Sequence, residues 1–239
     1  MLACAMVAGI FAYQKFFHAA KQTVSARKEI QVTRIEGWRS GLRDPITDDE
    51  RAAYPFLAHL PRQRTLEGYL FPDTYRVWED AMPAGLIKKQ LDAFAWRFAS
   101  STIEPDLAPL KTLDDVVILA SIIEREVPDT DDRRIVAGIF LNRLRDGMAL
   151  QSDATITFVT GSTGTRTTAK ELAIRSPYNT YAHAGLPPGP VCNPGSIAIE
   201  SVLHPKHTAY RYFLTDRAGK VLYAKTFAEH KRNRLRAGY

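Results

Sequence analysis

The alternation of apolar and polar residues predicts several amphipathic helices, and the most apolar of these covers residues 113–127. The run from Val116 to Ile123 contains only one polar residue, Ser121. Thr112 is a candidate N-cap, aspartates follow in the first turn, and Pro128 disfavours continuation of the helix. We therefore expect a helix from about Leu113 to Val127.

This predicted helix places a carboxyl group inside its apolar stripe. At 100° per residue Glu124 lies in the middle of an apolar arc, whereas Glu126 points almost the opposite way. Burial and the negative end of the helix dipole both favour the protonated acid, as a general acid requires. Glu124 is therefore the candidate catalytic residue and Glu126 a structural carboxylate. The alternative is that Glu124 is structural, paired with Arg125, Arg143 or a backbone amide. The apolar arc consists of Leu113, Val116, Val117, Ala120 and Val127.

Similar patterns predict the remaining elements and an α+β fold. The helix after Glu124 should pack against it as a hairpin, because the connection is short. We expect a helical catalytic core around the buried-glutamate helix, with a small antiparallel sheet from the 209–224 hairpin and from strands near 30–35 and 66–77. The stretch 39–65 is interpreted as a connecting region. The predicted helices cover 14–29, a short segment from Asp48, 84–99, a segment from Asp131 or Asp132 to Asp146, 193–204 and a last helix opened by the capping box Thr226–Glu229.

Composition indicates a globular protein with an anionic partner. The chain has 239 residues, 45% of them hydrophobic and 24% charged, which suffices for one large or two small cores. A net charge of +6 favours nucleic acid, a membrane surface or an acidic cell-wall polymer. No nucleic-acid-binding motif supports the first of these, and a nucleic-acid partner is not expected. Cys4 and Cys192 are read as free thiols, and no motif predicts a metal or another cofactor.

The N-terminal stretch from Met1 to Tyr13 is apolar and ends at Gln14. It is shorter than the roughly 20 residues that span a bilayer. It can be the trimmed end of a membrane anchor, a signal-like segment, or a helix that packs on the domain. We favour the anchor.

Residues 176–195 form a proline- and glycine-rich stretch that fits no regular element. A long loop stiffened in this way is usually functional. Its side chains supply flat apolar faces and neutral hydrogen-bonding groups, which suit a sugar ligand. The alternative is a structural cover over the core. The loop residues that suit a sugar ligand are Tyr178, Asn179, Thr180, Tyr181 and Asn193.

Several stretches, taken in order from about residue 30 to 233, resemble the endolytic lytic transglycosylases of the YceG-like family. The matching pieces are Glu36-Gly-Trp38, Glu67-Gly-Tyr-Leu-Phe-Pro-Asp-Thr-Tyr75, Ala120-Ser-Ile-Ile-Glu-Arg-Glu126, Asn142-Arg-Leu-Arg145, Gly147-Met148, Leu150-Gln-Ser-Asp153, Ser176-Pro-Tyr-Asn-Thr-Tyr181, Gly185-Leu-Pro-Pro-Gly-Pro190, Asn193-Pro-Gly195, Tyr210–Phe213 and Glu229-His230.

The resemblance implies an enzyme that cuts peptidoglycan glycan strands internally, beside the wall synthases, and that a single N-terminal helix holds at the bacterial cytoplasmic membrane with its catalytic domain outside. It implies a shortened anchor segment over 1–29, an abbreviated LysM-like or linker region over 30–75 and a catalytic domain over 76–239. It also places the catalytic glutamate at Glu124.

A lytic transglycosylase can work with one carboxyl group. We expect Glu124 to protonate the glycosidic oxygen and then to take the proton of the C6 hydroxyl of N-acetylmuramic acid, which closes a 1,6-anhydro ring. Two alternatives remain: a hydrolytic muramidase with Asp153 or Asp73 as second carboxylate, and a non-catalytic wall-binding or assembly factor. The expected substrate contacts are Arg143, Gln151, Ser152, Asp153, Tyr178, Asn179, Tyr181 and Asn193.

Overall fold

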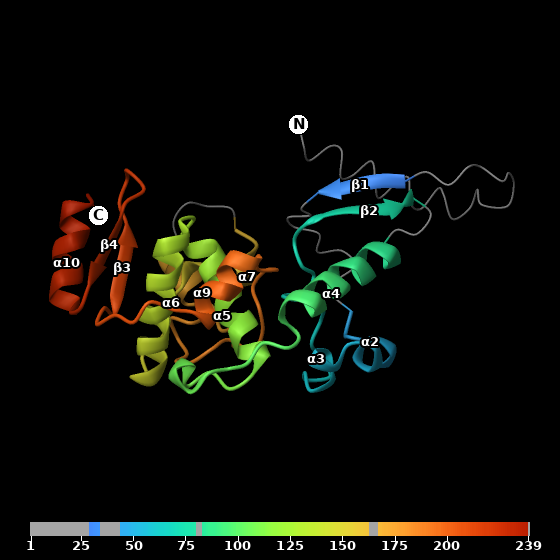
Figure 1. Ribbon diagram of the computed structural model, residues 1–239. Coiled ribbons are helices and arrows are strands. Elements are labelled where there is room, and N and C mark those ends of the chain that lie inside the picture. Colours follow the sequence, from blue (N-terminus) through green and yellow to red (C-terminus); the bar gives the residue numbers. More distant parts are fainter. Residues whose placement is uncertain (1–28, 34–43, 80–82, 163–166, 239) are drawn as a thin grey trace, which may run out of the picture.

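The computed structural model describes residues 29–33, 44–79, 83–162 and 167–238. A group of helices lies in the middle of the molecule, with one strand pair and the last helix at one end and the other strand pair and the first helices at the other (Figure 1). In chain order the elements are β1 (Glu29–Thr33), α2 (Asp48–Ala53), α3 (Pro55–Ala58), β2 (Thr74–Trp78), α4 (Ala84–Phe98), the 3-10 turn η2 (Pro105–Leu107), α5 (Leu113–Glu126), α6 (Thr130–Arg145), α7 (Asp153–Thr160), α8 (Ala169–Leu172), α9 (Ser196–Leu203), β3 (Tyr212–Thr215), β4 (Val221–Ala224) and α10 (Phe227–Arg236).

Helix α5 is the buried centre of the fold. Thr112 and Asp115 form a reciprocal capping box at its start, which satisfies backbone N–H groups that the helix leaves free. Every residue from Val116 to Ile123 is buried, so neighbours cover the helix on all sides. These neighbours include α6, α7 and α9. The predicted helix and its packing against the next helix are confirmed.

The segment before α5 is part of the same hydrophobic core. Leu57, Leu60 and Tyr69 are buried in the cluster that contains α5, and α4 packs on β2. Strands β1 and β2 pair antiparallel, with Glu29 opposite Trp78. The interpretation of 39–65 as a mere connection is therefore wrong for its described part, because Pro55–Ala58 forms a helix whose apolar residues join the core.

The C-terminal part is a hairpin followed by one helix. Strands β3 and β4 pair antiparallel, with Tyr212 opposite Ala224, and α10 contacts both strands. Phe140 of α6 meets Phe213 of β3 edge to face, with ring centroids 5.7 Å apart, which joins this part to the helical core. The hairpin and the capping box of the last helix, Thr226 with Glu229, are confirmed.

The α+β class is confirmed, with three differences in detail. The strands near 30–35 and 66–77 pair with each other, so the described residues hold two separate sheets of two strands. Helix α7 was not predicted, because its sequence is rich in β-branched residues that favour helices weakly. The boundary expected after residue 75 falls inside β2.

The N-terminal expectations cannot be compared with the fold. The helix over 14–29, the turn at 36–38 and the membrane anchor lie outside the described residues. Within the described ranges, no helix combines the length and apolar character needed to cross a bilayer.

Candidate active site

The last turn of α5 carries two glutamates that face different neighbours. Glu124 and Glu126 are two residues apart on a helix, so their side chains point about 200° apart. Both are partly shielded from solvent, because both sides of α5 are covered. Each of the two glutamates is therefore a candidate catalytic group.

Glu124 joins three helices. Its two carboxylate oxygens accept hydrogen bonds of 3.2 Å from the two terminal nitrogens of Arg133 on α6. One oxygen also accepts a 3.0 Å bond from the backbone N–H of Gly195, the N-cap of α9. Arg133 is fixed in turn by a 2.8 Å bond to the carbonyl of Val127. All partners of Glu124 donate, and such donors stabilise a negative charge.

Glu126 has a different environment. The Ser152 hydroxyl donates a short hydrogen bond to its carboxyl group, and Asp153 lies nearby. Burial and, to a smaller extent, the negative charge of Asp153 raise the pKa of Glu126 from 4.5 to about 7, against the opposing effects of Ser152 and Arg143. A carboxyl group with this pKa is protonated in a large fraction of molecules at neutral pH, which suits a general acid.

Arg143 is a buried cation beside Glu126. Its Nε donates to the carbonyl of Arg211 at 2.6 Å, and its Nη1 donates to the carbonyl of Leu150 at 2.6 Å. Its guanidinium carbon lies 5.3 Å from the centre of the Tyr212 ring. These contacts fix the end of α6 to β3 and to the α6–α7 connection.

The connection from α6 to α7 brings polar groups to the same place. The N–H groups of Gln151 and Ser152 donate to the carbonyl and hydroxyl oxygens of Thr180, both at 3.0 Å. The Tyr181 hydroxyl donates to Asp153 at 2.7 Å. Burial and this bond raise the pKa of Tyr181, so the phenol stays a donor. Residues 151–153 are thus held against the 176–195 loop.

The 176–195 loop is fixed at many points, as its proline content suggested. The side-chain oxygen of Asn193 accepts bonds from the N–H groups of Gly68 (2.7 Å) and Leu70 (3.1 Å). Val191 N–H donates to Ser121 of α5 at 2.9 Å. Residues 176–195 contain no helix or strand, so the prediction of an irregular loop is confirmed.

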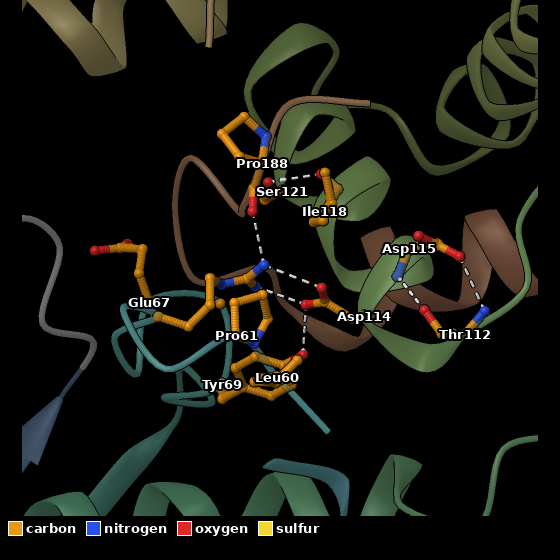
Figure 2. A network of polar contacts seen from close by, with 12 residues as sticks. Leu60, Pro61, Glu67, Tyr69, Thr112, Asp114, Asp115, Ile118, Ser121 and Pro188 are labelled. Atoms are coloured by element: carbon orange, nitrogen blue, oxygen red, sulfur yellow. Dashed lines mark hydrogen bonds and ion pairs between the residues drawn. The ribbon is translucent and has the colours of Figure 1, made fainter. Parts of the chain in front are cut away.

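A buried ion pair holds the same loop near Pro188. Arg64 donates to the Pro188 carbonyl at 2.8 Å and to both carboxylate oxygens of Asp114 at 3.0 and 2.6 Å. Tyr69 donates to Asp114 at 2.7 Å. Figure 2 shows Asp114 between Tyr69 and the Pro188 segment. The start of α5, the segment 64–70 and the loop therefore form one connected structure.

The structure divides the predicted site residues into two groups. The first group lies around Glu126 rather than Glu124 and consists of Arg143, Gln151, Ser152, Asp153 and Tyr181. The second group stabilises the 176–195 loop and consists of Tyr178, Asn179 and Asn193. Asn179 is buried, with its amide donating to the carbonyls of Leu172 and Ile174 and its oxygen accepting from Tyr181 and Ala182. Asn193 bonds to the backbone, and Tyr178 packs on Phe158.

Sequence reasoning gave Glu126 no catalytic role and interpreted it as a structural carboxylate. Helical periodicity placed Glu126 opposite the apolar arc, and α7 and the α6–α7 connection cover that side. The unbroken apolar run of α5 was the available signal, because a helix that is apolar all round is buried all round. Thr180 was among the polar loop residues expected to suit a sugar ligand, and in the structure it accepts hydrogen bonds from the N–H groups of Gln151 and Ser152.

Comparison with known proteins agrees with this architecture. A sequence model of the YceG-like family matches residues 8–236. The chain belongs to the YceG-like family. The resemblance noted in the sequence motifs is thereby confirmed.

Similar proteins carry a functional name. The chain is 39% identical over 171 residues to the endolytic murein transglycosylase of Bacillus subtilis (strain 168), covering 70% of this chain and 46% of that protein. It is 38% identical over 178 residues to the protein of the same name from Streptococcus pneumoniae (serotype 2), covering 70% and 31%. The chain thus spans less than half the length of these relatives.

A solved structure shares the fold of this family member. The crystal structure of a yceG-like protein from Listeria monocytogenes is 34% identical, superimposes with a TM-score of 0.67, and covers 77% of this chain and 62% of that chain.

Proposed function

We propose that this chain is an endolytic murein transglycosylase, a lyase that cleaves the bond between N-acetylmuramic acid and N-acetylglucosamine inside peptidoglycan strands without adding water. Membership in the YceG-like family and the name of its relatives support this function. The single observation that carries the chemistry is the geometry of the Glu126 carboxyl group, which lies between α5 and the α6–α7 connection and accepts a hydrogen bond from Ser152; burial raises its pKa to about 7.

In the proposed reaction Glu126 acts first as acid and then as base. Its proton goes to the glycosidic oxygen, the bond from that oxygen to C1 of N-acetylmuramic acid breaks, and N-acetylglucosamine leaves as an alcohol. The Glu126 carboxylate then takes the proton of the C6 hydroxyl of the same muramic unit. The C6 oxygen bonds to C1 and closes the 1,6-anhydro ring, and Glu126 is protonated again. One carboxyl group is sufficient for this cycle.

The neighbours of Glu126 have defined parts in this proposal. Ser152 orients the carboxyl group through its hydrogen bond. Asp153, held by Tyr181, provides negative charge for the positive charge that develops at C1. Arg143 is a positioning residue, because its bonds to Arg211 and Leu150 fix the segments that carry the site.

The sequence pattern and the family resemblance both predict Glu124 as the catalytic acid, and Glu126 is the alternative assignment of that role. Its bonds to Arg133 and Gly195 support the structural alternative, in which a backbone amide is one partner. The two assignments differ in one measurable respect. Replacement of the acid abolishes the chemistry, whereas replacement of a structural carboxylate weakens the fold.

The test is mass spectrometry of products from peptide-free glycan strands. The wild type, Glu126→Gln and Glu124→Gln are compared at equal folded concentration. We expect anhydro-ended internal fragments from the wild type and from Glu124→Gln, and none from Glu126→Gln. The opposite pattern would restore Glu124 as the acid. Products heavier by one water would indicate a muramidase that uses Asp153, and no products from the wild type would favour a wall-binding factor.

The same proposal places the chain at the outer face of the bacterial cytoplasmic membrane, with the N-terminal apolar segment as single anchor and peptidoglycan synthases as neighbours. Fractionation of cells that produce the chain with and without residues 1–17 tests the anchor. Release of the shortened chain into the soluble fraction is the expected result. Crosslinking in the same cells tests the contact with synthases.

A further inference from the structure

Helix α10 covers the β3–β4 hairpin with one face and leaves its other face open. Asn233 donates to the carbonyl of Tyr223 at 3.0 Å, and the His230 ring stacks on Tyr212 with centroids 5.4 Å apart. Ala237, just after the helix, is buried. Figure 1 shows α10 at one end of the molecule, with the hairpin between it and α6. The opposite face of α10 is therefore in contact with solvent.

This open face carries two large apolar side chains. Phe227 and Leu235 are eight residues apart, which on an α-helix is a rotation of only about 80°, and Lys231 lies between them. Phe227 is 54% exposed and Leu235 is 77% exposed. Both side chains would gain free energy if another surface removed them from water. The open face of α10 is defined by Phe227, Ala228, Lys231, Arg232, Arg234 and Leu235, all of which are exposed.

Basic side chains surround the two apolar ones. The ten residues of α10 include four cations and one acid, Glu229, whose carboxylate accepts bonds from the N–H groups of Lys225 and Thr226. In the part of the chain that the structure describes, no recorded ion pair includes any of the four cations. Their charge is therefore available to a partner outside the chain. The four are Lys231, Arg232, Arg234 and Arg236.

Stabilisation of the helix itself explains only part of this charge. Cations interact favourably with the helix dipole in the last turn, and the effect falls off beyond it. Lys231 and Arg232 precede the last turn of α10. A further cation comes from the turn between β3 and β4, where Arg217 donates to the carbonyl of Gly238 at 3.0 Å. The fold thus gathers like charges around one helix, which favours an anionic partner.

We propose that the open face of α10 binds the surface of a membrane that contains anionic phospholipids. A helix in this position places apolar side chains at the boundary between headgroups and acyl chains, and its Lys and Arg side chains meet the headgroup phosphates. Phe227 and Leu235 suit the first contact, and the four cations suit the second. A soluble acidic polymer would pair with the cations and leave both apolar side chains in water. The lipid surface therefore accounts for more of the observations.

The test places an environment-sensitive fluorophore on α10 in the full chain. Ala228→Cys carries the label on the open face, and Ala169→Cys, at an exposed alanine of α8, is the control. Cys4→Ser removes one competing thiol. Burial raises the pKa of Cys192 to about 12, so its thiol reacts slowly with the label. The vesicles consist of phosphatidylcholine alone or of phosphatidylcholine mixed with phosphatidylglycerol, and the difference between the two cancels binding through apolar contacts alone.

We expect the emission of the α10 label to shift to shorter wavelength with the mixed vesicles only, and the α8 label to stay unchanged. Lys231→Gln with Arg234→Gln should lower the ratio of shifted to unshifted label roughly 25-fold, because each cation near an anionic surface contributes about fivefold. Leu235→Ser should lower the same ratio about tenfold. Lys111→Gln with Lys170→Gln is the matched control, since it removes equal charge from exposed positions outside α10, and should have no effect. Circular dichroism and thermal unfolding verify that every variant is folded.

Three results would overturn the proposal: no shift of the α10 label, an equal shift with neutral vesicles, or equal effects of the two double substitutions. A shift that soluble polyphosphate also produces, and that persists in Leu235→Ser, would overturn it in favour of an acidic polymer. The inference is independent of which glutamate is the acid, and none of these measurements requires cleavage. Absence of anhydro-ended products from the wild type would therefore refute the proposed function alone.

Discussion

Replacement of Glu126 by glutamine should stabilise the protein at alkaline pH while it removes activity. Folding raises the pKa of this carboxyl group from 4.5 to about 7, a difference of about 2.5 pH units. Each pH unit corresponds to about 1.4 kcal/mol, so the fold disfavours the ionised group by about 3 kcal/mol. Glutamine keeps the shape and an acceptor for Ser152 but cannot ionise.

The direction of the effect follows from the two pKa values. Below about pH 4.5 the carboxyl group is protonated in both the folded and the unfolded chain, so its ionisation does not change the free energy of unfolding. Above about pH 7 it is ionised in both states, and the full penalty falls on the folded state. The free energy of unfolding of the wild type should therefore decrease relative to Glu126→Gln as the pH rises from about 4.5 to 7.

Urea unfolding of the two proteins, followed by circular dichroism at five pH values from 5 to 9, measures this difference. We expect Glu126→Gln to gain about 3 kcal/mol over the wild type by pH 8. Glu124→Gln is the control and should lose about 2 kcal/mol at neutral pH, because it breaks the ion pair with Arg133. Equal destabilisation by both substitutions at pH 8 would refute the reasoning, since Glu126 would then be an ordinary structural carboxylate.

Three further predictions concern the surroundings of α5. Ser152→Ala removes the hydrogen bond that lowers the pKa of Glu126, so the alkaline limb of the pH profile of kcat/KM should move up by as much as about 1 pH unit. Asp114→Asn breaks a buried ion pair and should lower the free energy of unfolding in urea by about 3 kcal/mol, with faster proteolysis of the 176–195 loop. Gly68→Ala should cost about 3 kcal/mol in the same assay, because a Cβ there would lie 2.4 Å from Pro190 at φ of 96°. Unchanged values would contradict each prediction in turn.

Local chemistry made most of the fold predictable. Capping boxes at Thr112 and Thr226 and the apolar periodicity of α4, α5 and α6 act within a few residues of the chain, so the sequence contains them directly. Helix α7 depends on packing against α5 rather than on propensity, and its β-branched residues concealed it. The pairing of β1 with β2 joins residues 41 to 49 positions apart, and such a contact leaves no local pattern.

The sequence predicted several polar residues that the structure brings together, and the choice between Glu124 and Glu126 as catalytic acid stays a prediction. The residues 151–153, Arg143 and Tyr181 were expected to contact substrate, and they do lie together. Periodicity and the family resemblance both selected the glutamate in the apolar arc, but periodicity does not show what covers the other side of a helix. The partners that distinguish Glu124 from Glu126, namely Arg133 and Ser152, are brought in by tertiary structure.

The attachment of the 176–195 loop also bears on how quickly a strand can be bound. Its bonds to Gly68, to Ser121 and from Arg64 mean that it cannot swing as a lid. The entropy of ordering this loop is lost when the chain folds, not when a polymer arrives. In the proposed reaction a strand would then meet a loop that is already ordered, without a gate having to open for each turnover. An enzyme of this kind should show association rates limited by diffusion of the polymer and by the orientation of its sugars, with little contribution from motion of the protein.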